Sequence, residues 1–311
     1  MKGTIIKNLK LTKVIDGDTV KIMLDNKEES IRFVCLDTEE SQHGSDKPVT
    51  NAGILASKWA KAYFGANEQG IPADDVRVDI EFDTNDPVKA CLRKHRDNYG
   101  RLLCYVYKSG TKENSNLRIV QEGWSPYFAK YGRSRLFHLQ FMEAEAHAQA
   151  AGIAIWNPAT NAGGDKRDYS ILTPWWNFRD SVVQDYRLYG LQAGALSVRT
   201  DYEAIVEAAK AGNQLTVLCD LQTGINAWTG GGALIYAGSI FQKFNLWIPN
   251  CDSLEAQIVL KLIENRYGGQ GRRNYVYVSG EASMYPSNAQ GKPQIVITDV
   301  GQLKDFPLGD R

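Results

Sequence analysis

Two clusters of acids and two arginines are the residues of this chain whose types and spacing could do chemistry. In chain order they are Asp16-Gly17-Asp18, Arg32, Asp37-Thr38-Glu39-Glu40, and Arg101 at the end of Asp97-Asn98-Tyr99-Gly100-Arg101. Carboxylates bind hard divalent cations, and guanidinium groups bind the oxygens of a phosphate. Together these side chains are the ones that metal-assisted cleavage of a phosphodiester requires.

Each of these signals is weak when it stands alone. The tripeptide Asp16-Gly17-Asp18 is typical of a surface turn, and a single arginine is typical of a surface salt bridge. All of them occurring in order is what favours a site. Asp18 and Asp37 are the best candidates for metal ligands because they lie at the ends of different expected strands, and Asp16 is expected to be structural.

The elements expected to position these residues form a small barrel. Apolar alternation predicts half-buried strands over residues 20–24, 31–35, 76–82 and 103–107. Helices are expected over 52–63, 116–122 and 137–151, the last two ending at Gly123 and Gly152. Strands that come first and a helix that closes the unit predict an OB-type barrel with packed helices.

The C-terminal half shows a second pattern of the same kind. Strands are expected over 215–219, 234–236, 244–248, 275–278 and 294–298, and a helix begins near Asp252 or Ser253. Two further helices are expected over 175–187 and 201–211. We therefore predict an α+β, mainly β fold of two tandem OB-type five-stranded barrels: a domain over 1–158, a linker over 159–174, and a connector with the second domain over 175–311.

Across roughly residues 10–156, the acids and arginines at these places resemble the staphylococcal nuclease (thermonuclease-like) family. The resemblance implies a calcium-dependent hydrolase that cleaves DNA, and we expect RNA as well, without sequence specificity. It implies that Ca²⁺ is bound by Asp18, Asp37 and the backbone carbonyl of Thr38. It also implies a phosphate clamp made of Arg32 and Arg101.

The resemblance gives Glu40 the role of activating the attacking water, either as a general base or by ordering that water. The family normally has proline at the preceding position, where this chain has Glu39. The exchange removes a backbone restraint and adds a negative charge beside the metal. That charge would either favour the cation or weaken the approach of a phosphate.

Substrate contacts are expected from aromatic and basic side chains. The resemblance implies that Tyr99 contacts the substrate phosphate and that Tyr127 stacks on a base, although packing is at least as good an explanation for Tyr127. Stacking suits single-stranded or breathing duplex substrates. In the second domain, Arg272 and Arg273 either contact phosphate or form a solvated turn, and the nearby Tyr275 and Tyr277 either line a groove or pack.

Composition narrows the remaining possibilities. The 311 residues favour two domains, and 36 basic against 36 acidic residues leave the partner class open. The five cysteines lack metal-ligand spacing, so we expect buried free thiols. Charges interrupt the N-terminal segment, so we expect a cytoplasmic protein without a membrane partner.

Two other interpretations stay open at this point. A non-catalytic nucleic-acid-binding or scaffold protein could use the same fold, and the second domain could bind substrate or restrain the nuclease.

The polar loop over residues 41–51 is expected to be flexible and to border the substrate.

Overall fold

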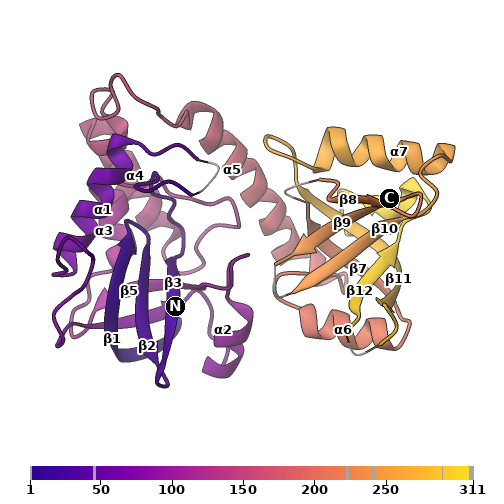
Figure 1. Ribbon diagram of the computed structural model, residues 1–311, viewed down its shortest axis with the longest axis horizontal. Helices are drawn as coiled ribbons and strands as arrows, with labels where there is room; N and C mark the ends of the chain where they lie inside the picture. Colours follow the sequence, from indigo (N-terminus) through magenta and orange to yellow (C-terminus); the bar gives the residue numbers. More distant parts are fainter. Residues whose placement is uncertain (1, 45–46, 222–223, 240–241, 289, 308–311) are drawn as a thin grey trace. The chain divides into compact units, whose positions relative to one another are not determined.

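The computed structural model describes residues 2–44, 47–221, 224–239, 242–288 and 290–307. The chain divides into two compact units (Figure 1). The first contains 1–97 and 101–176, and the second contains 98–100 and 177–311. Within the described residues, no helix combines the length and the apolar content that crossing a membrane requires.

The first unit is built on a closed five-stranded barrel, as predicted. Its strands are β1 (Thr4–Asp16), β2 (Thr19–Leu24), β3 (Lys27–Phe33), β4 (Arg77–Phe82) and β5 (Leu102–Lys108). They follow the order β1-β2-β3-β5-β4, and only the β3–β5 ladder is parallel. The parallel ladder sets the end of β3 beside the start of β5.

Four α-helices belong to this barrel: α1 (Asn51–Tyr63), α2 (Val88–Lys94), α3 (Ser115–Gln121) and α4 (His138–Ala151). A short 3-10 helix follows at Ala154–Trp156. The three predicted helices are confirmed, whereas α2 was not expected. Helix α1 begins where the Thr50 side chain accepts a hydrogen bond from the Gly53 N–H at 3.0 Å.

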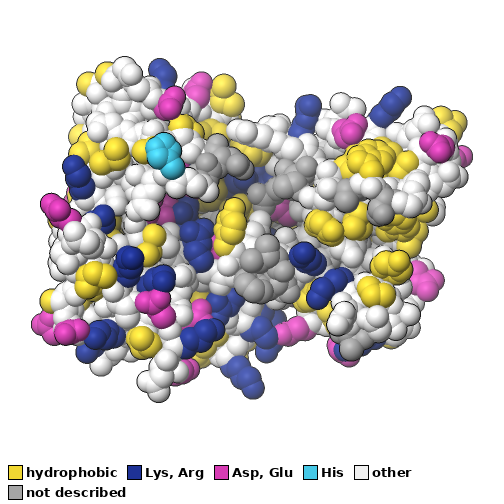
Figure 2. All heavy atoms as spheres, in the orientation of Figure 1, with side chains coloured by type: hydrophobic (Ala, Val, Ile, Leu, Met, Phe, Trp, Pro, Cys, Tyr) yellow, Lys and Arg dark blue, Asp and Glu magenta, His cyan; other side chains and the backbone are white. Residues whose placement is uncertain are grey.

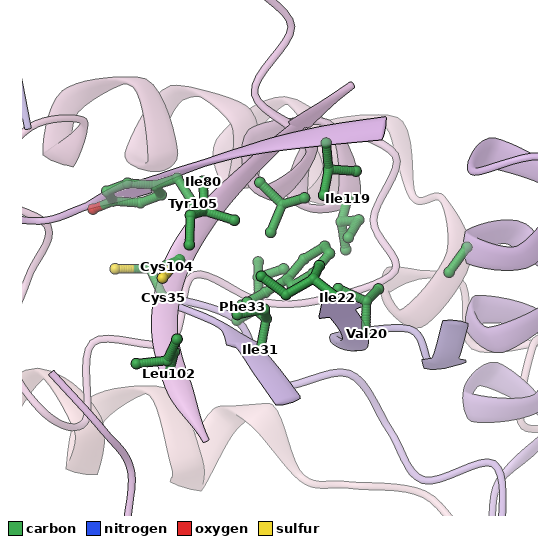
Figure 3. Close-up of a cluster of buried hydrophobic side chains, with 14 of the residues drawn as sticks. Val20, Ile22, Ile31, Phe33, Cys35, Ile80, Leu102, Cys104, Tyr105 and Ile119 are labelled. Carbon is green, nitrogen blue, oxygen red and sulfur yellow. The ribbon is translucent and has the colours of Figure 1, made fainter. Parts of the chain in front are cut away.

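Apolar side chains from every strand fill the barrel (Figure 3). None of the following is more than 1 % exposed: Val20, Ile22, Ile31, Phe33, Ile80, Leu102, Cys104, Tyr105 and Ile119. Burial of such side chains is the main source of a domain's stability, at about 25 cal/mol per Å² of apolar surface. The barrel is therefore a rigid frame for the loops at its ends.

The segment expected to be a linker, 159–174, is instead bonded to the first unit. Asn51 Nδ2 donates to the Thr160 carbonyl at 2.7 Å, and the Ala52 N–H donates to Asn161 Oδ1 at 2.8 Å. Helix α5 (Tyr169–Asp185) begins before Pro174, after which we had expected it to start. That expectation was wrong: the helix begins at Tyr169 and continues through Pro174, although proline normally disfavours a helix interior. The unit boundary follows residue 176, inside this helix.

The described residues of the second unit form eight strands: β6 (Leu196–Ser197), β7 (Gln214–Asp220), β8 (Ala227–Thr229), β9 (Gly232–Gly238), β10 (Lys243–Ile248), β11 (Tyr275–Tyr285), β12 (Lys292–Val296) and β13 (Leu303–Lys304). Helices α6 (Tyr202–Lys210) and α7 (Leu254–Leu262) belong to the same unit. Short π-helical turns extend α5 and α7 at Tyr186–Gly190 and Ile263–Tyr267, and a 3-10 helix forms at Val300–Gln302.

The second sheet has the strand order of an OB barrel but is not closed. The β9–β10, β11–β12 and β7–β11 ladders are antiparallel and β10–β12 is parallel, which reproduces four of the five ladders of the first barrel. Between the described residues of β7 and β9, no ladder completes the circle. The predicted five-stranded barrel is thus corrected to an open eight-stranded sheet, because β6 and β8 extend the two ends of the strand order, β13 pairs with β11, and no ladder joins the described residues of β7 to those of β9.

Candidate active site

Strand pairing brings three of the predicted site residues to one end of the first barrel. The β2–β3 register pairs Thr19 with Arg32, so Asp18 lies directly beside the arginine. The parallel β3–β5 register pairs Arg32 with Leu103, and Arg101 comes two residues earlier. The strand pairing therefore brings together Asp18, Arg32 and Arg101, which are far apart in the sequence.

Arg32 connects the two predicted metal-ligand carboxylates. Its Nη1 donates to Asp18 Oδ1, and its Nη2 donates to Asp37 Oδ1 at 2.6 Å. The side chains of Asp18 and Asp37 are 4 % and 5 % exposed, against 16 % for Arg32. The arginine thus neutralises two buried charges while one edge of it stays accessible to solvent.

Asp18 is held by two threonines in addition to Arg32. The Thr19 hydroxyl donates to Oδ1 at 2.9 Å, and Thr38 donates its N–H and its hydroxyl to Oδ2 at 3.0 and 2.9 Å. A Cβ at Gly17 would lie 2.8 Å from the Thr38 side chain, so only glycine permits this close approach. The neighbouring Asp16 is itself largely buried, and burial together with the Asp18 charge raises its pKa to about 6.

Asp37 accepts hydrogen bonds from two cations that the sequence analysis did not assign to the site. Lys47 Nζ donates to both carboxylate oxygens at 2.9 and 3.0 Å, and Arg167 Nη2 donates to Oδ2 at 2.5 Å. Burial alone would raise the pKa of Asp37, but Arg167, Lys47 and Arg32 together outweigh it and hold that pKa well below its usual range. Lys47 lies in the loop that we expected to be flexible, of which residues 45–46 lie outside the described part.

Glu40, the predicted water-activating residue, is more exposed to solvent than the neighbouring acids Asp37 and Glu39. Its side chain is 25 % exposed and its Oε1 lies 3.6 Å from Lys47 Nζ. The Glu40 carbonyl accepts from the Thr50 N–H at 3.1 Å, and a Cβ at Gly53 would lie 2.1 Å from that same oxygen. The glycine therefore lets the start of α1 close on the Glu40 backbone.

Glu39 is bonded by side chains from the segment expected to be a linker. The residue is 1 % exposed, and its carboxylate accepts from Tyr169 Oη and Asn161 Nδ2, both at 2.9 Å. The sequence analysis expected this charge to act on the cation or on the phosphate. In the structure the carboxylate instead ties its own loop to residues 161 and 169.

Arg101 lies beside the same cluster with a different set of partners. Its N–H and Nε donate to the two Asp97 carboxylate oxygens at 2.8 and 2.7 Å, and its Nη1 donates to the Thr19 hydroxyl at 3.3 Å. The Arg101 side chain is 28 % exposed. Tyr99, the predicted phosphate contact, is 74 % exposed.

Tyr127 does not lie where a base could stack on it. The residue is 7 % exposed, its ring stacks on Phe141 at 5.0 Å, and its hydroxyl lies 3.0 Å from His138 Nδ1. The predicted substrate contact is therefore corrected to a core residue. Sequence could not separate these roles, because an aromatic side chain suits a core and a stacking platform equally well.

In the second unit, the predicted phosphate contact of Arg273 is corrected, and Tyr275 and Tyr277 follow the packing alternative. Arg273 donates to the Tyr275 carbonyl at 3.1 Å and to the Asp305 carbonyl at 2.7 Å, with its side chain 11 % exposed. Tyr275 and Tyr277 are 2 % and 1 % exposed, so neither lines a groove. Arg272 is exposed and stays a candidate for a phosphate contact.

The chemistry of the donor set at this site fits a hard divalent cation. Asp18 and Asp37 supply carboxylates, with Thr38 between them and Glu40 nearby. Each of the four aspartate oxygens accepts two hydrogen bonds, so a cation that reaches Asp37 has to replace a nitrogen donor. In this arrangement, the part of the chain that the structure describes holds no group of three or more His, Cys, Asp or Glu side chains with metal-site geometry.

Comparison with known proteins gives the family of the chain. The family model for staphylococcal nuclease homologues matches residues 30–158. The thermonuclease of Staphylococcus intermedius is 30% identical over 145 residues, which cover 46% of this chain and 73% of that protein. This chain therefore belongs to the staphylococcal nuclease family.

Two Bacillus subtilis proteins are also similar to part of this chain. Endonuclease YncB is 30% identical over 159 residues, covering 50% of this chain and 66% of that protein. The SPbeta prophage-derived endonuclease YokF is 28% identical over 147 residues, covering 47% and 43%. The chain thus spans under two thirds of the length of each of these relatives.

Proposed function

We propose that this protein is a metal-dependent nuclease that hydrolyses phosphodiester bonds in DNA, and also in RNA, without sequence specificity. The observation that carries the proposal is the Arg32 guanidinium, which joins the buried carboxylates of Asp18 and Asp37 at a barrel end next to Arg101. Membership of the nuclease family and relatives named thermonuclease and endonuclease support it.

In this proposal Asp18, Asp37 and Thr38 hold the cation, for which we propose Ca²⁺. A bound divalent cation polarises the scissile phosphate and neutralises charge that develops on it. Arg32 and Arg101 bind the phosphate oxygens, because planar guanidinium groups match two oxygens at once and stabilise the extra charge of the transition state.

Glu40 is proposed to activate or order the attacking water. It is the more solvent-accessible of the two loop glutamates, and its carboxylate lies close to the Lys47 ammonium rather than inside a buried ion pair. A carboxylate near solvent can receive a proton from water and return it to bulk. Glu39 suits this role less well, since its carboxylate is buried and already accepts hydrogen bonds from Asn161 and Tyr169.

The substrate is proposed to be single-stranded or breathing nucleic acid, with the exposed Tyr99 ring available to it. The second unit is proposed to bind or position the strand through the exposed Arg272.

Figure 2 shows Lys and Arg side chains interspersed with Asp and Glu on the visible face of the first unit. Contact with phosphates therefore depends on local basic side chains rather than on net charge.

The experiment is digestion of single- and double-stranded DNA and RNA by the full chain, with calcium, with magnesium and with chelator. We expect cleavage with calcium and none with chelator. Glu40→Gln should remove most of that activity, whereas Glu113→Gln, which alters an exposed acid of the same unit, should not. Binding without cleavage under every condition would favour a non-catalytic nucleic-acid-binding protein, and full activity in chelator would exclude the proposed site.

A further inference from the structure

Three side chains from residues 161–169, beyond the matched family region, bind the loop that carries the proposed metal ligand and base. They are Asn161, Arg167 and Tyr169, and their partners are Asp37 and Glu39. The start of α1 fixes the same segment through the Ala52 N–H. All of these residues belong to the first unit.

Arg167 binds Asp37 at two different atoms. Its Nη2 donates to the carboxylate at 2.5 Å, and its Nη1 donates to the backbone carbonyl of the same residue at 3.1 Å. One guanidinium thus fixes the side chain and the backbone of Asp37 together. Lys47, the other added cation, donates to the Asp37 carboxylate and lies 3.6 Å from Glu40 Oε1.

The guanidinium of Arg167 is held in place by two aromatic rings as well as by Asp37. It lies 5.6 Å from the centre of the Tyr169 ring and 5.5 Å from that of Trp176, and its side chain is 10 % exposed. A stacked, planar guanidinium loses little further freedom when it forms hydrogen bonds. Arg167 is therefore built to hold a carboxylate in a defined orientation.

Glu39 gives the same segment a second hold on the loop. Its buried carboxylate is satisfied by one hydroxyl and one amide donor. Leaving a buried charged acceptor without its donor costs about 1–3 kcal/mol or more. The loop is therefore bonded to residues 161–169 at two acids, Asp37 and Glu39, which are separated by one residue.

We infer that Arg167 is a positioning residue of this site, which acts through Asp37, and that the bonds of Asn161 and Tyr169 to Glu39 hold the same loop in register. The inference rests on the proposed nuclease function for its catalytic consequence. Its physical content is that residues outside the family-matched barrel fix the orientation of a proposed metal ligand.

The test uses full-length Arg167→Gln, Arg167→Lys and Tyr169→Phe. Matched controls are Arg118→Gln, which alters an exposed arginine of the same unit, and Tyr202→Phe, which removes a hydroxyl bonded to a backbone carbonyl elsewhere. Three readouts are needed: amide hydrogen exchange of residues 36–41, calorimetric titration with Ca²⁺, and kcat and KM on single-stranded DNA.

We expect faster exchange at the Asp37 and Thr38 amides in Arg167→Gln and Tyr169→Phe but in neither control. The turnover of Arg167→Gln should fall by about 10-fold or more with little change in KM, because small misplacements of catalytic groups cost up to about 100-fold. Arg167→Lys, which keeps the positive charge, should recover part of the lost turnover.

Unchanged loop exchange and unchanged kcat in both variants would overturn the inference. Tighter calcium binding with unchanged kcat in Arg167→Gln would also overturn it, since Arg167 would then only occupy the place of the cation. Should Arg167→Gln fail to fold, Tyr169→Phe removes a single oxygen and decides the matter by the same readouts. If the wild-type protein cleaves nothing but the loop still exchanges faster in Arg167→Gln and Tyr169→Phe, the nuclease proposal is rejected and the positioning role is retained.

Discussion

Thr38 donates both its backbone N–H and its hydroxyl to the same oxygen of Asp18, at 3.0 and 2.9 Å. Asp18 lies in the turn between β1 and β2, whereas Thr38 lies in the loop after β3. The pair therefore fixes the distance between two segments that each carry a proposed metal ligand. A site assembled in this way is oriented before any ligand arrives, which is what efficient catalysis requires.

The two clamp arginines should respond differently to removal. Arg101→Ala should lower kcat by about two to three orders of magnitude, the usual scale for a lost transition-state charge partner. Its melting temperature should change little, because its ion pair with Asp97 is partly exposed. Steady-state kinetics and thermal unfolding on the same preparation check both statements.

Arg32→Ala should lose activity and stability together. It leaves the buried carboxylates of Asp18 and Asp37 without their shared cation, and breaking a buried pair costs about 3–5 kcal/mol. A well-folded Arg32→Ala protein with a wild-type melting temperature would contradict the burial argument. An Arg101→Ala protein with undiminished turnover would remove Arg101 from the site.

Asn116 should be among the most sensitive positions of the barrel. It is fully buried, and its amide donates to the Val34 and Cys104 carbonyls at 2.9 and 3.2 Å while it accepts from the Val106 N–H at 3.0 Å. Asn116→Leu should cost about 3 kcal/mol or more, since each unpaired buried group costs about 1–3 kcal/mol. Urea unfolding measures the loss, and Asn85→Leu, at an exposed position of the same unit, is the control. Equal midpoints for the two variants would show that the network contributes little.

Periodicity predicted the elements that face the core on one side only. Strands β2 to β5 and helices α1, α3 and α4 were found because their apolar spacing is regular. Strand β1 was missed because bulges break its alternation, with register shifts after Ile6, Leu11 and Val14 and a positive φ at Asn8. Helix α2 was missed because Cys91 is the one buried residue among its seven, which leaves no apolar stripe to recognise.

Only the site residues whose order along the chain matches a known family could be predicted from the sequence. The acids and arginines of the barrel follow the chain order of a known family, but Lys47 and Arg167 lie in segments without periodic pattern. Their contacts with Asp37 depend on how distant loops close, which local sequence does not encode. Tyr127 and Arg273 show the opposite error, because residue type alone does not distinguish a buried side chain from a ligand contact.

The second unit should lose stability in acid through Asp305. Burial alone would raise the pKa of this carboxyl, but hydrogen bonds from Arg266 and Tyr267 and the charge of Arg273 lower it. A lowered folded-state pKa stabilises the fold above the unfolded pKa of about 3.9, and this contribution is lost as pH falls through the folded value. Urea unfolding between about pH 5 and about pH 3 should therefore show a shallower pH dependence for Asp305→Asn than for wild type. Asp252→Asn, at an exposed acid of this unit, should keep the wild-type slope. Parallel slopes for Asp305→Asn and wild type would contradict the ion-pair account.

Arg272 and Arg273 are neighbours in sequence, and the structure gives them separate roles. Arg273 is bonded to the Tyr275 and Asp305 carbonyls and is mostly buried, whereas Arg272 is exposed. Arg273→Ala should therefore lower the melting temperature and leave the salt dependence of binding to single-stranded DNA unchanged.

Arg272→Ala should keep the wild-type melting temperature and bind single-stranded DNA more weakly. Its plot of log affinity against log salt should be shallower by about 0.7, the loss of one phosphate contact on a single strand. Fluorescence anisotropy at several salt concentrations measures the slope. If Arg272→Ala matches wild type in affinity and slope, this loop does not contact the strand. A shallower slope for Arg273→Ala instead would mean that the buried arginine leaves its carbonyl partners to reach the phosphate, which its hydrogen bonds in the structure argue against.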